Sequence, residues 1–159
     1  MELDSGRERP RLRPRRPMGI EALEVYDRRG DGHTVSRHCG TNPVEEEARL
    51  ERHPALPATG SFPDVPTAQR SVEACVAAHR DEVEQWRRGP RIRLAIDHDM
   101  GEVIGDVLRR GGGVAGDPAP QSATGVRVVL RRNRSYRAGF AVLTAYPILH
   151  ATTAYRRRQ

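Results

Sequence analysis

Lysine is absent from this sequence of 159 residues, so all 27 of its Lys and Arg positions are arginine. Mechanisms that need a lysine Schiff base, a lysine general base or the lysine of a phosphate-binding loop are therefore excluded. Any basic side chain that contacts a phosphate or carboxylate group must use a planar, permanently charged guanidinium group.

Cysteine and aromatic residues are also scarce. The two cysteines, Cys39 and Cys75, lack the CxxC spacing of zinc sites, so we predict neither a metal centre nor a disulfide framework. Cys75 is expected on the buried side of a helix, and Cys39 is expected to fill space beside Gly40 rather than to act as a nucleophile. With 4% aromatic and 36% hydrophobic residues, the chain predicts one domain with a modest core.

Long apolar runs are missing as well. No stretch approaches the roughly 18 residues of a membrane span, and the N-terminus lacks the hydrophobic core of a signal peptide. We therefore expect no membrane span, and export would need another route or a longer precursor.

The charge is strongly positive, at +6 with an isoelectric point near 10.3. This favours an anionic partner, with nucleic acid first and an acidic protein second. Much of the excess lies at the ends of the chain. We interpret residues 1–17 as a disordered Arg/Pro-rich segment, residues 18–149 as the domain, and residues 150–159 as a basic tail.

Helical signals fill the first half of the domain. A short helix is expected over residues 20–29, and Asn42 with Pro43 and Glu45 predicts a capping box that starts a helix running to about residue 53. Residues 53–66 contain four prolines and predict an irregular crossing. Apolar residues at three- and four-residue spacing predict one long helix over residues 66–87, with His79 as a structural residue on its apolar stripe.

Alternating patterns fill the second half. Strands are predicted over residues 91–96, 102–108, 126–131 and 139–146, with a Gly/Pro-rich loop over residues 109–121 and Pro147 ending the last strand. Helices followed by strands indicate an α+β fold with a mainly antiparallel sheet. In the last strand, alternation places Phe140, Val142, Thr144 and Tyr146 on one face.

Candidate functional residues lie in two places. A Gly-flanked segment before the helix at residue 43 carries His33 and His38, and Arg49 lies about two turns into that helix. This could bring a proton-transfer group and a fixed positive charge to one anion, with His38 facing solvent or a ligand. Thr144 and Tyr146 could bind a base edge or a phosphate. The simpler alternatives are a loop histidine with a local hydrogen bond, an Arg49–Glu45 pair along the helix, and ordinary strand residues.

A metal nuclease is a further alternative. Asp97, His98 and Asp99 are consecutive and carry metal-ligating groups. Consecutive residues of a strand point to opposite faces, however, so these three do not easily converge on one ion.

Several short motifs occur together in a recognisable order. They are Gly32-His33-Thr34, Arg37-His38, Gly40, Arg49-Leu50, Ser61-Phe62-Pro63, Val128-Val129-Leu130-Arg131, and Gly139 followed by Leu143-Thr144-Ala145-Tyr146-Pro147. Their order over residues 20–149, with a His eleven residues before an Arg and a terminal Thr-x-Tyr-Pro, resembles the bacterial ribonuclease A-like toxin domain. That domain ends the proteins of contact-dependent growth inhibition and related polymorphic toxins.

The resemblance implies a kidney-shaped α+β fold without disulfides and metal-independent cleavage of RNA, with no cofactor. Family active-site positions fall on His38, Arg49, Thr144 and Tyr146, and His33 is a supporting position. An acidic immunity protein is the implied partner, and a monomer delivered into the cytoplasm of a target bacterium is expected. The long delivery region that normally precedes such a domain is missing from this sequence, which suggests a cassette or a trimmed form.

RNA supplies its own nucleophile, because its 2′-hydroxyl attacks the adjacent phosphorus and leaves a 2′,3′-cyclic phosphate. His38, if it titrates near ~6.5, is suited to the proton transfer, and Arg49 to stabilising charge on the phosphate. Thr144 would bind a base or phosphate. The second acid/base group stays open between His33 and Tyr146. A non-catalytic basic RNA-binding module and a metal-dependent nuclease remain the alternative functions.

Overall fold

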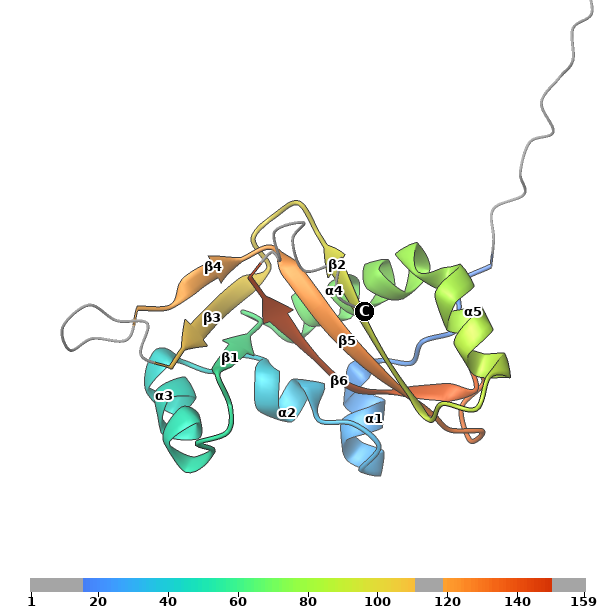
Figure 1. The fold of residues 1–159 in the computed structure, drawn as a ribbon, viewed down its shortest axis with the longest axis horizontal. Coiled ribbons are helices and arrows are strands. Elements are labelled where there is room, and N and C mark those ends of the chain that lie inside the picture. Colours follow the sequence, from blue (N-terminus) through green and yellow to red (C-terminus); the bar gives the residue numbers. More distant parts are fainter. Residues whose placement is uncertain (1–15, 111–118, 150–159) are drawn as a thin grey trace, which may run out of the picture.

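The computed structural model describes residues 16–110 and 119–149 (Figure 1). Its elements in chain order are α1 (Leu23–Arg29), α2 (Thr34–His38), α3 (Pro43–Arg52), β1 (Ala58–Ser61), α4 (Val65–Ala78), α5 (Arg80–Arg88), β2 (Arg93–Asp99), β3 (Gly105–Arg109), β4 (Gln121–Ala123), β5 (Gly125–Arg132) and β6 (Phe140–Ile148). The predicted α+β class is confirmed. Residues 1–15 of the segment predicted as disordered over residues 1–17, and the predicted basic tail at residues 150–159, lie outside the described residues.

The strands form two antiparallel sheets of three, in the orders β1-β3-β4 and β2-β5-β6 (Figure 1). Helix α4 packs against β2 and β5 and covers one face of the second sheet. The largest buried side chains between them include Val72, Val76, Val128 and Leu130. Both cysteines are free, so packing rather than disulfides holds this core. In the described ranges, no helix is long and apolar enough to cross a membrane.

The two sheets meet where β6 passes close to β1. A Cβ atom on Gly60 would lie 2.5 Å from the carbonyl oxygen of Pro147. Gly105 on β3 is equally restricted, since a Cβ there would meet the carbonyl of Ser61 and the ring of Pro147. The absence of side chains at these two glycines therefore allows the backbones of the two sheets to approach each other.

Helix α3 begins as its sequence predicts. The Asn42 side chain accepts a hydrogen bond from the Glu45 backbone N–H at 3.0 Å, and the Glu45 carboxylate accepts one from the Asn42 N–H at 3.0 Å. This capping box fixes the entry of α3 and, with it, the direction in which Arg49 leaves the helix.

Four features differ from the predictions. The single helix expected over residues 66–87 is broken at His79, which has φ −105° and ψ 22° and separates α4 from α5. The expected irregular crossing at residues 53–66 contains β1, a short strand that depends on pairing with the distant β3. Strand β4 begins at Gln121, inside the predicted Gly/Pro-rich loop, of which residues 111–118 lie outside the described residues. Strand β6 runs through Pro147 to Ile148 because an edge strand tolerates proline.

A β-bulge divides β6 into two halves. Val129 pairs with Thr144 and Leu130 pairs with Val142, so Leu143 is an extra residue in β6. The prediction that Phe140, Val142, Thr144 and Tyr146 share one face is therefore wrong. Phe140 and Val142 point into the core, whereas Thr144 and Tyr146, as predicted, face the same way as each other, on the other side of the sheet.

Helix α2, which the sequence did not predict, lies against this bulge. The His33 N–H donates to the Leu143 carbonyl at 3.1 Å, and the Ala145 N–H donates to the Thr34 hydroxyl at 2.9 Å. Backbone groups of the edge strand are thereby bonded by the start of α2. This attachment brings His33, the N-cap of α2, and His38, its last residue, close to β6.

Candidate active site

His38 is held by β1 and is 5% exposed. Its Nδ1 lies 2.9 Å from the Gly60 carbonyl oxygen, and its own carbonyl accepts a hydrogen bond from the Phe62 N–H at 2.7 Å. The next residue, Cys39, forms a parallel bridge with Phe62. Of the two expectations for His38, a ring that faces solvent or a ring that faces a ligand, the first does not hold, because β1 covers and orients the ring.

Arg49 lies beside His38, as their spacing suggested. Its Nη1 donates to the Arg37 carbonyl at 3.2 Å and lies 3.4 Å from His38 Nδ1. The shorter contact of Nδ1 is to the Gly60 carbonyl, so we assign a proton to Nδ1 that it donates to this carbonyl. A protonated Nδ1 cannot also accept a hydrogen bond from Arg49. The neutral ring then keeps its lone pair on Nε2. Glu45 serves the capping box, so the alternative of an Arg49–Glu45 pair is not what the structure shows.

The site holds its imidazoles in the neutral form. The pKa of His38 is lowered to about 4, mainly by burial; the hydrogen bond to the Gly60 carbonyl opposes this change, and the charge of Arg49 adds a smaller lowering effect. Burial and then the charge of Arg37 also lower the pKa of His33. The expected titration of His38 near ~6.5 therefore does not hold in this closed geometry.

Tyr146 approaches His38 from β6. The centroids of the two rings lie 5.2 Å apart, and the His33 and His38 ring centroids are 6.3 Å apart. Opposite Tyr146 across the ladder is Arg127, which makes a bidentate ion pair with Asp97 at 2.7 and 2.8 Å. Hydrogen bonding to Asp97, and secondarily the neighbouring Tyr146, raises the pKa of Arg127.

Thr144 lies two residues before Tyr146 on the same face. Its Oγ1 is buried and has no hydrogen-bond partner among the described groups. A buried hydroxyl without a partner is energetically costly.

All five predicted site residues therefore lie around the junction of α2, α3 and β6. His33, Arg49 and Tyr146 each lie near His38, and Thr144 lies two residues before Tyr146 on the same face of β6. Tyr146 also borders a pocket of about 170 Å³ together with Thr59 and Arg109. These positions suit proton transfer and charge stabilisation at a phosphate.

Sequence reasoning missed two contributors to the site, the Gly60 carbonyl and Arg127, and it named Asp97 only as part of the alternative metal site. Of the two that were missed, only Arg127 left a usable signal. Arg127 stands between Val126 and Val128 in a predicted strand, and strand alternation places it on the face opposite these two core residues. The Gly60 carbonyl could not be found, because β1 itself was not predicted.

Asp97 is bound by Arg127, which donates a hydrogen bond to each of its two carboxylate oxygens. His98 points to the other side of β2, with its ring 6.2 Å from that of His79. Across residues 16–110 and 119–149, no three His, Cys, Asp or Glu side chains gather in metal-binding geometry. Asp97 and His98 therefore point to opposite sides of β2.

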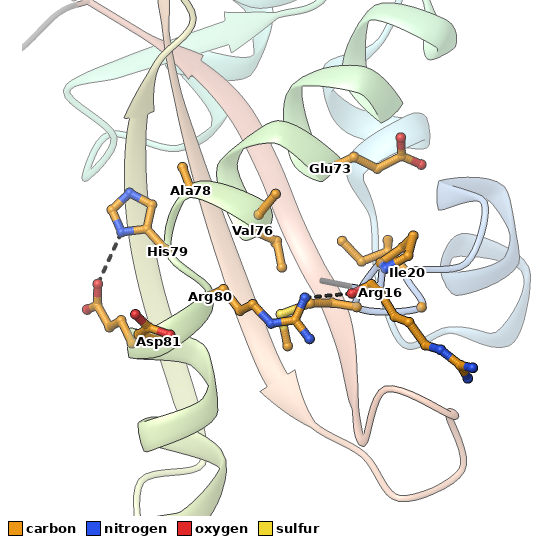
Figure 2. Close-up of a pocket in the computed structure, with 13 residues that line it drawn as sticks. Arg16, Ile20, Glu73, Val76, Ala78, His79, Arg80 and Asp81 are labelled. Atoms are coloured by element: carbon orange, nitrogen blue, oxygen red, sulfur yellow. Dashed lines mark hydrogen bonds and ion pairs between the residues drawn. The ribbon is translucent and has the colours of Figure 1, made fainter. Parts of the chain in front are cut away.

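A cavity of about 640 Å³ lies elsewhere (Figure 2). It is bordered by residues 16–20 and by the junction of α4 and α5, where Arg80 donates to the Arg16 carbonyl at 2.5 Å. His79 lies at its edge with both ring nitrogens engaged, one by Glu82 at 3.2 Å and one by the Asp97 carbonyl at 2.8 Å. No predicted catalytic residue lines this cavity, so its size does not make it the candidate site.

Comparison with known proteins gives two findings. Residues 32–147 match the family model described as "Bacterial CdiA-CT RNAse A domain". The fold is similar to the crystal structure of a CdiA-CT/CdiI complex from Y. kristensenii 33638, with a TM-score of 0.65 and 24% identity over 74% of this chain and 99% of that one. No curated protein matches the chain. The family match covers more than half of the sequence, and the chain therefore belongs to the bacterial CdiA-CT RNAse A domain family.

Proposed function

We propose that this chain is an endoribonuclease toxin that cleaves RNA without a metal ion, through a 2′,3′-cyclic phosphate. Membership of the family supports a ribonuclease toxin. The observation that carries the mechanism is the orientation of His38. Its Nδ1 is engaged by the Gly60 carbonyl, which leaves Nε2 as the basic nitrogen of a ring that lies beside Arg49 and Tyr146.

In the reaction, Nε2 of His38 removes the proton of the 2′-hydroxyl, and the oxygen attacks phosphorus. The bond from phosphorus to the 5′-oxygen breaks, and Tyr146 donates a proton to that leaving oxygen. Arg49 stabilises the charge that builds on the phosphate oxygens, as a guanidinium does well. A general base of this kind contributes on the order of 10²- to 10⁴-fold.

A low pKa keeps His38 in the base form at neutral pH, but it also makes the ring a weak base. Substrate binding corrects this, because an anionic phosphate next to the ring favours its protonated form and raises its pKa. The basicity of His38 therefore increases when the phosphate is in place. Thr144, on the same face of β6 as Tyr146, is assigned to the base or phosphate of the substrate.

The test is incubation of the purified protein with total RNA in EDTA, beside His38→Ala and the control His53→Ala. His53 is exposed and lies outside the site. We expect the wild type and His53→Ala to leave cyclic phosphate ends, and His38→Ala to lose at least 10²-fold in rate. Circular dichroism checks that each variant is folded.

Two other results would overturn the proposal. RNA left intact by every variant, with tight and salt-sensitive binding, would make the chain a non-catalytic RNA-binding module. Activity that appears only when a divalent ion is added would make it a metal-dependent nuclease.

The proposed toxin also has a protein partner and a place of action. The similar crystal structure is of a CdiA-CT/CdiI complex, and the present chain carries a net charge of +6. An acidic immunity protein that covers the site would complement this charge. We propose that the domain acts as a monomer after delivery into a target bacterium.

A further inference from the structure

The β2-β5-β6 sheet has one face that α4 does not cover. Strand pairing arranges the residues of this open face in three rows: Asp97, Arg127 and Tyr146; Ala95, Val129 and Thr144; and Arg93 with Arg131. The first row contacts His38 through Tyr146. The third row lies at the other end of the face, and the proposed chemistry does not use it.

Arg93 and Arg131 face each other directly across β2 and β5, and both are exposed. Like charges in directly opposed cross-strand positions are destabilising. Among the described residues, no carboxylate forms an ion pair with either guanidinium. Arg127 differs, because Asp97 binds it through both oxygens. The unneutralised charge of the open face is therefore concentrated at the Arg93–Arg131 end.

The row between the two ends is small and mainly apolar. Ala95 is exposed, Val129 is half-buried, and Thr144 supplies the unpartnered hydroxyl. Along β5, Arg131 lies two residues from Val129 and four from Arg127, which is about 7 Å and about 13 Å at the rise of a strand. The face thus offers a cation pair roughly one nucleotide away from a site that could hold a base.

We propose that Arg93 and Arg131 form a phosphate-binding subsite that holds the backbone of single-stranded RNA one nucleotide beyond the base at Thr144. This inference rests on the proposed function and extends it to the substrate. The preferred substrate is an oligonucleotide with a phosphate outside the scissile linkage. Two guanidinium groups on neighbouring strands can grip one phosphate from both sides.

Binding is tested separately from catalysis with a single-stranded 2′-deoxy octanucleotide, which lacks the attacking hydroxyl. The variant is Arg93→Gln/Arg131→Gln, and the control is Arg52→Gln/Arg70→Gln, which removes the same charge from exposed positions on α3 and α4. The slope of log K against log salt should fall in magnitude by about 0.7 in the variant, the value for one phosphate on a single strand. The control should keep the wild-type slope.

Cleavage is tested with a dinucleoside monophosphate and an octanucleotide. We expect the Arg93→Gln/Arg131→Gln variant to lose about tenfold in kcat/KM on the octanucleotide through KM, and less than twofold on the dinucleotide. Because the variant relieves like-charge repulsion, its Tm should be unchanged or raised by about 1–3 °C. A lower Tm with equal losses on both substrates would indicate a structural role and overturn the inference.

The two proposals fail separately. If the wild type cleaves RNA and the variant keeps both the salt slope and the octanucleotide KM, the subsite is wrong and the ribonuclease stands. If the wild type cleaves nothing but the variant still loses salt dependence with the deoxy octanucleotide, the ribonuclease is wrong and the phosphate subsite stands.

Discussion

Acid should destabilise this protein through His38. The pKa of this group is about 4 in the folded chain, against 6.5 for an ordinary histidine. The unfolded chain therefore binds a proton more readily, and stability falls as the pH is lowered from 6.5 through 4. At about 1.4 kcal/mol for each pKa unit, protonation of His38 at low pH lowers the free energy of unfolding by about 3 kcal/mol. Only 5% of the residue is exposed, so solvent screens this effect little.

The measurement is urea unfolding of the wild type and of His38→Gln at several pH values from about 7.5 to about 4. This range spans the interval of about 4–6.5 in which His38 titrates in the folded or the unfolded chain. Carboxyl groups titrate in both proteins, so the comparison isolates His38. The stability difference between wild type and variant should be constant above pH 6.5 and should fall, to the disadvantage of the wild type, by about 1.4 kcal/mol per pH unit below it. Parallel curves across the whole range would refute the reasoning, because they would mean that the His38 ring is protonated as easily in the folded chain as in the unfolded one.

Two further predictions concern Tyr146 and Gly32. Tyr146→Phe should slow RNA cleavage by at least 10²-fold but barely affect a nucleoside 3′-(4-nitrophenyl phosphate), whose leaving group needs no proton; equal losses on both substrates would exclude Tyr146 as the proton donor. Gly32→Ala places a Cβ 2.5 Å from the Val142 carbonyl and should cost about 1–3 kcal/mol of unfolding free energy. Gly89→Ala, where the nearest atom is 3.7 Å away, is the matched control, and similar unfolding curves for the two alanine variants would contradict this reading.

Local signals in the sequence predicted what local forces determine. The capping box of Asn42 and Glu45 needs only residues within one turn, so the start of α3 was correctly predicted. The proximity of His38 and Arg49 followed from the placement of that helix. The break at His79 was not predicted, because the apolar stripe continues across it and the bonds that stabilise the bend go to Glu82 and to the Asp97 backbone.

Features that depend on distant partners could not be predicted in this way. Strand β1 is only four residues long, and its hydrogen-bond partner is β3. In the sequence, α4, α5 and β2 lie between these two strands. The burial of His38 depends on β1, through the Gly60 carbonyl and the pairing with Phe62. Because β1 was not predicted, the burial of His38 and its lowered pKa were not predicted either.

The bulge at Leu143 explains how one strand serves both the core and the site. Without the extra residue, the strict alternation of a strand would put Thr144 and Tyr146 on the core face that Val142 occupies. The bulge reverses the alternation after Val142 and exposes a carbonyl and an N–H at the sheet edge, which His33 and Thr34 bond. The same two contacts position the helix that ends at His38. The irregularity that turns Tyr146 towards the open face therefore also anchors the segment that carries the proposed base, which couples the positions of the two groups.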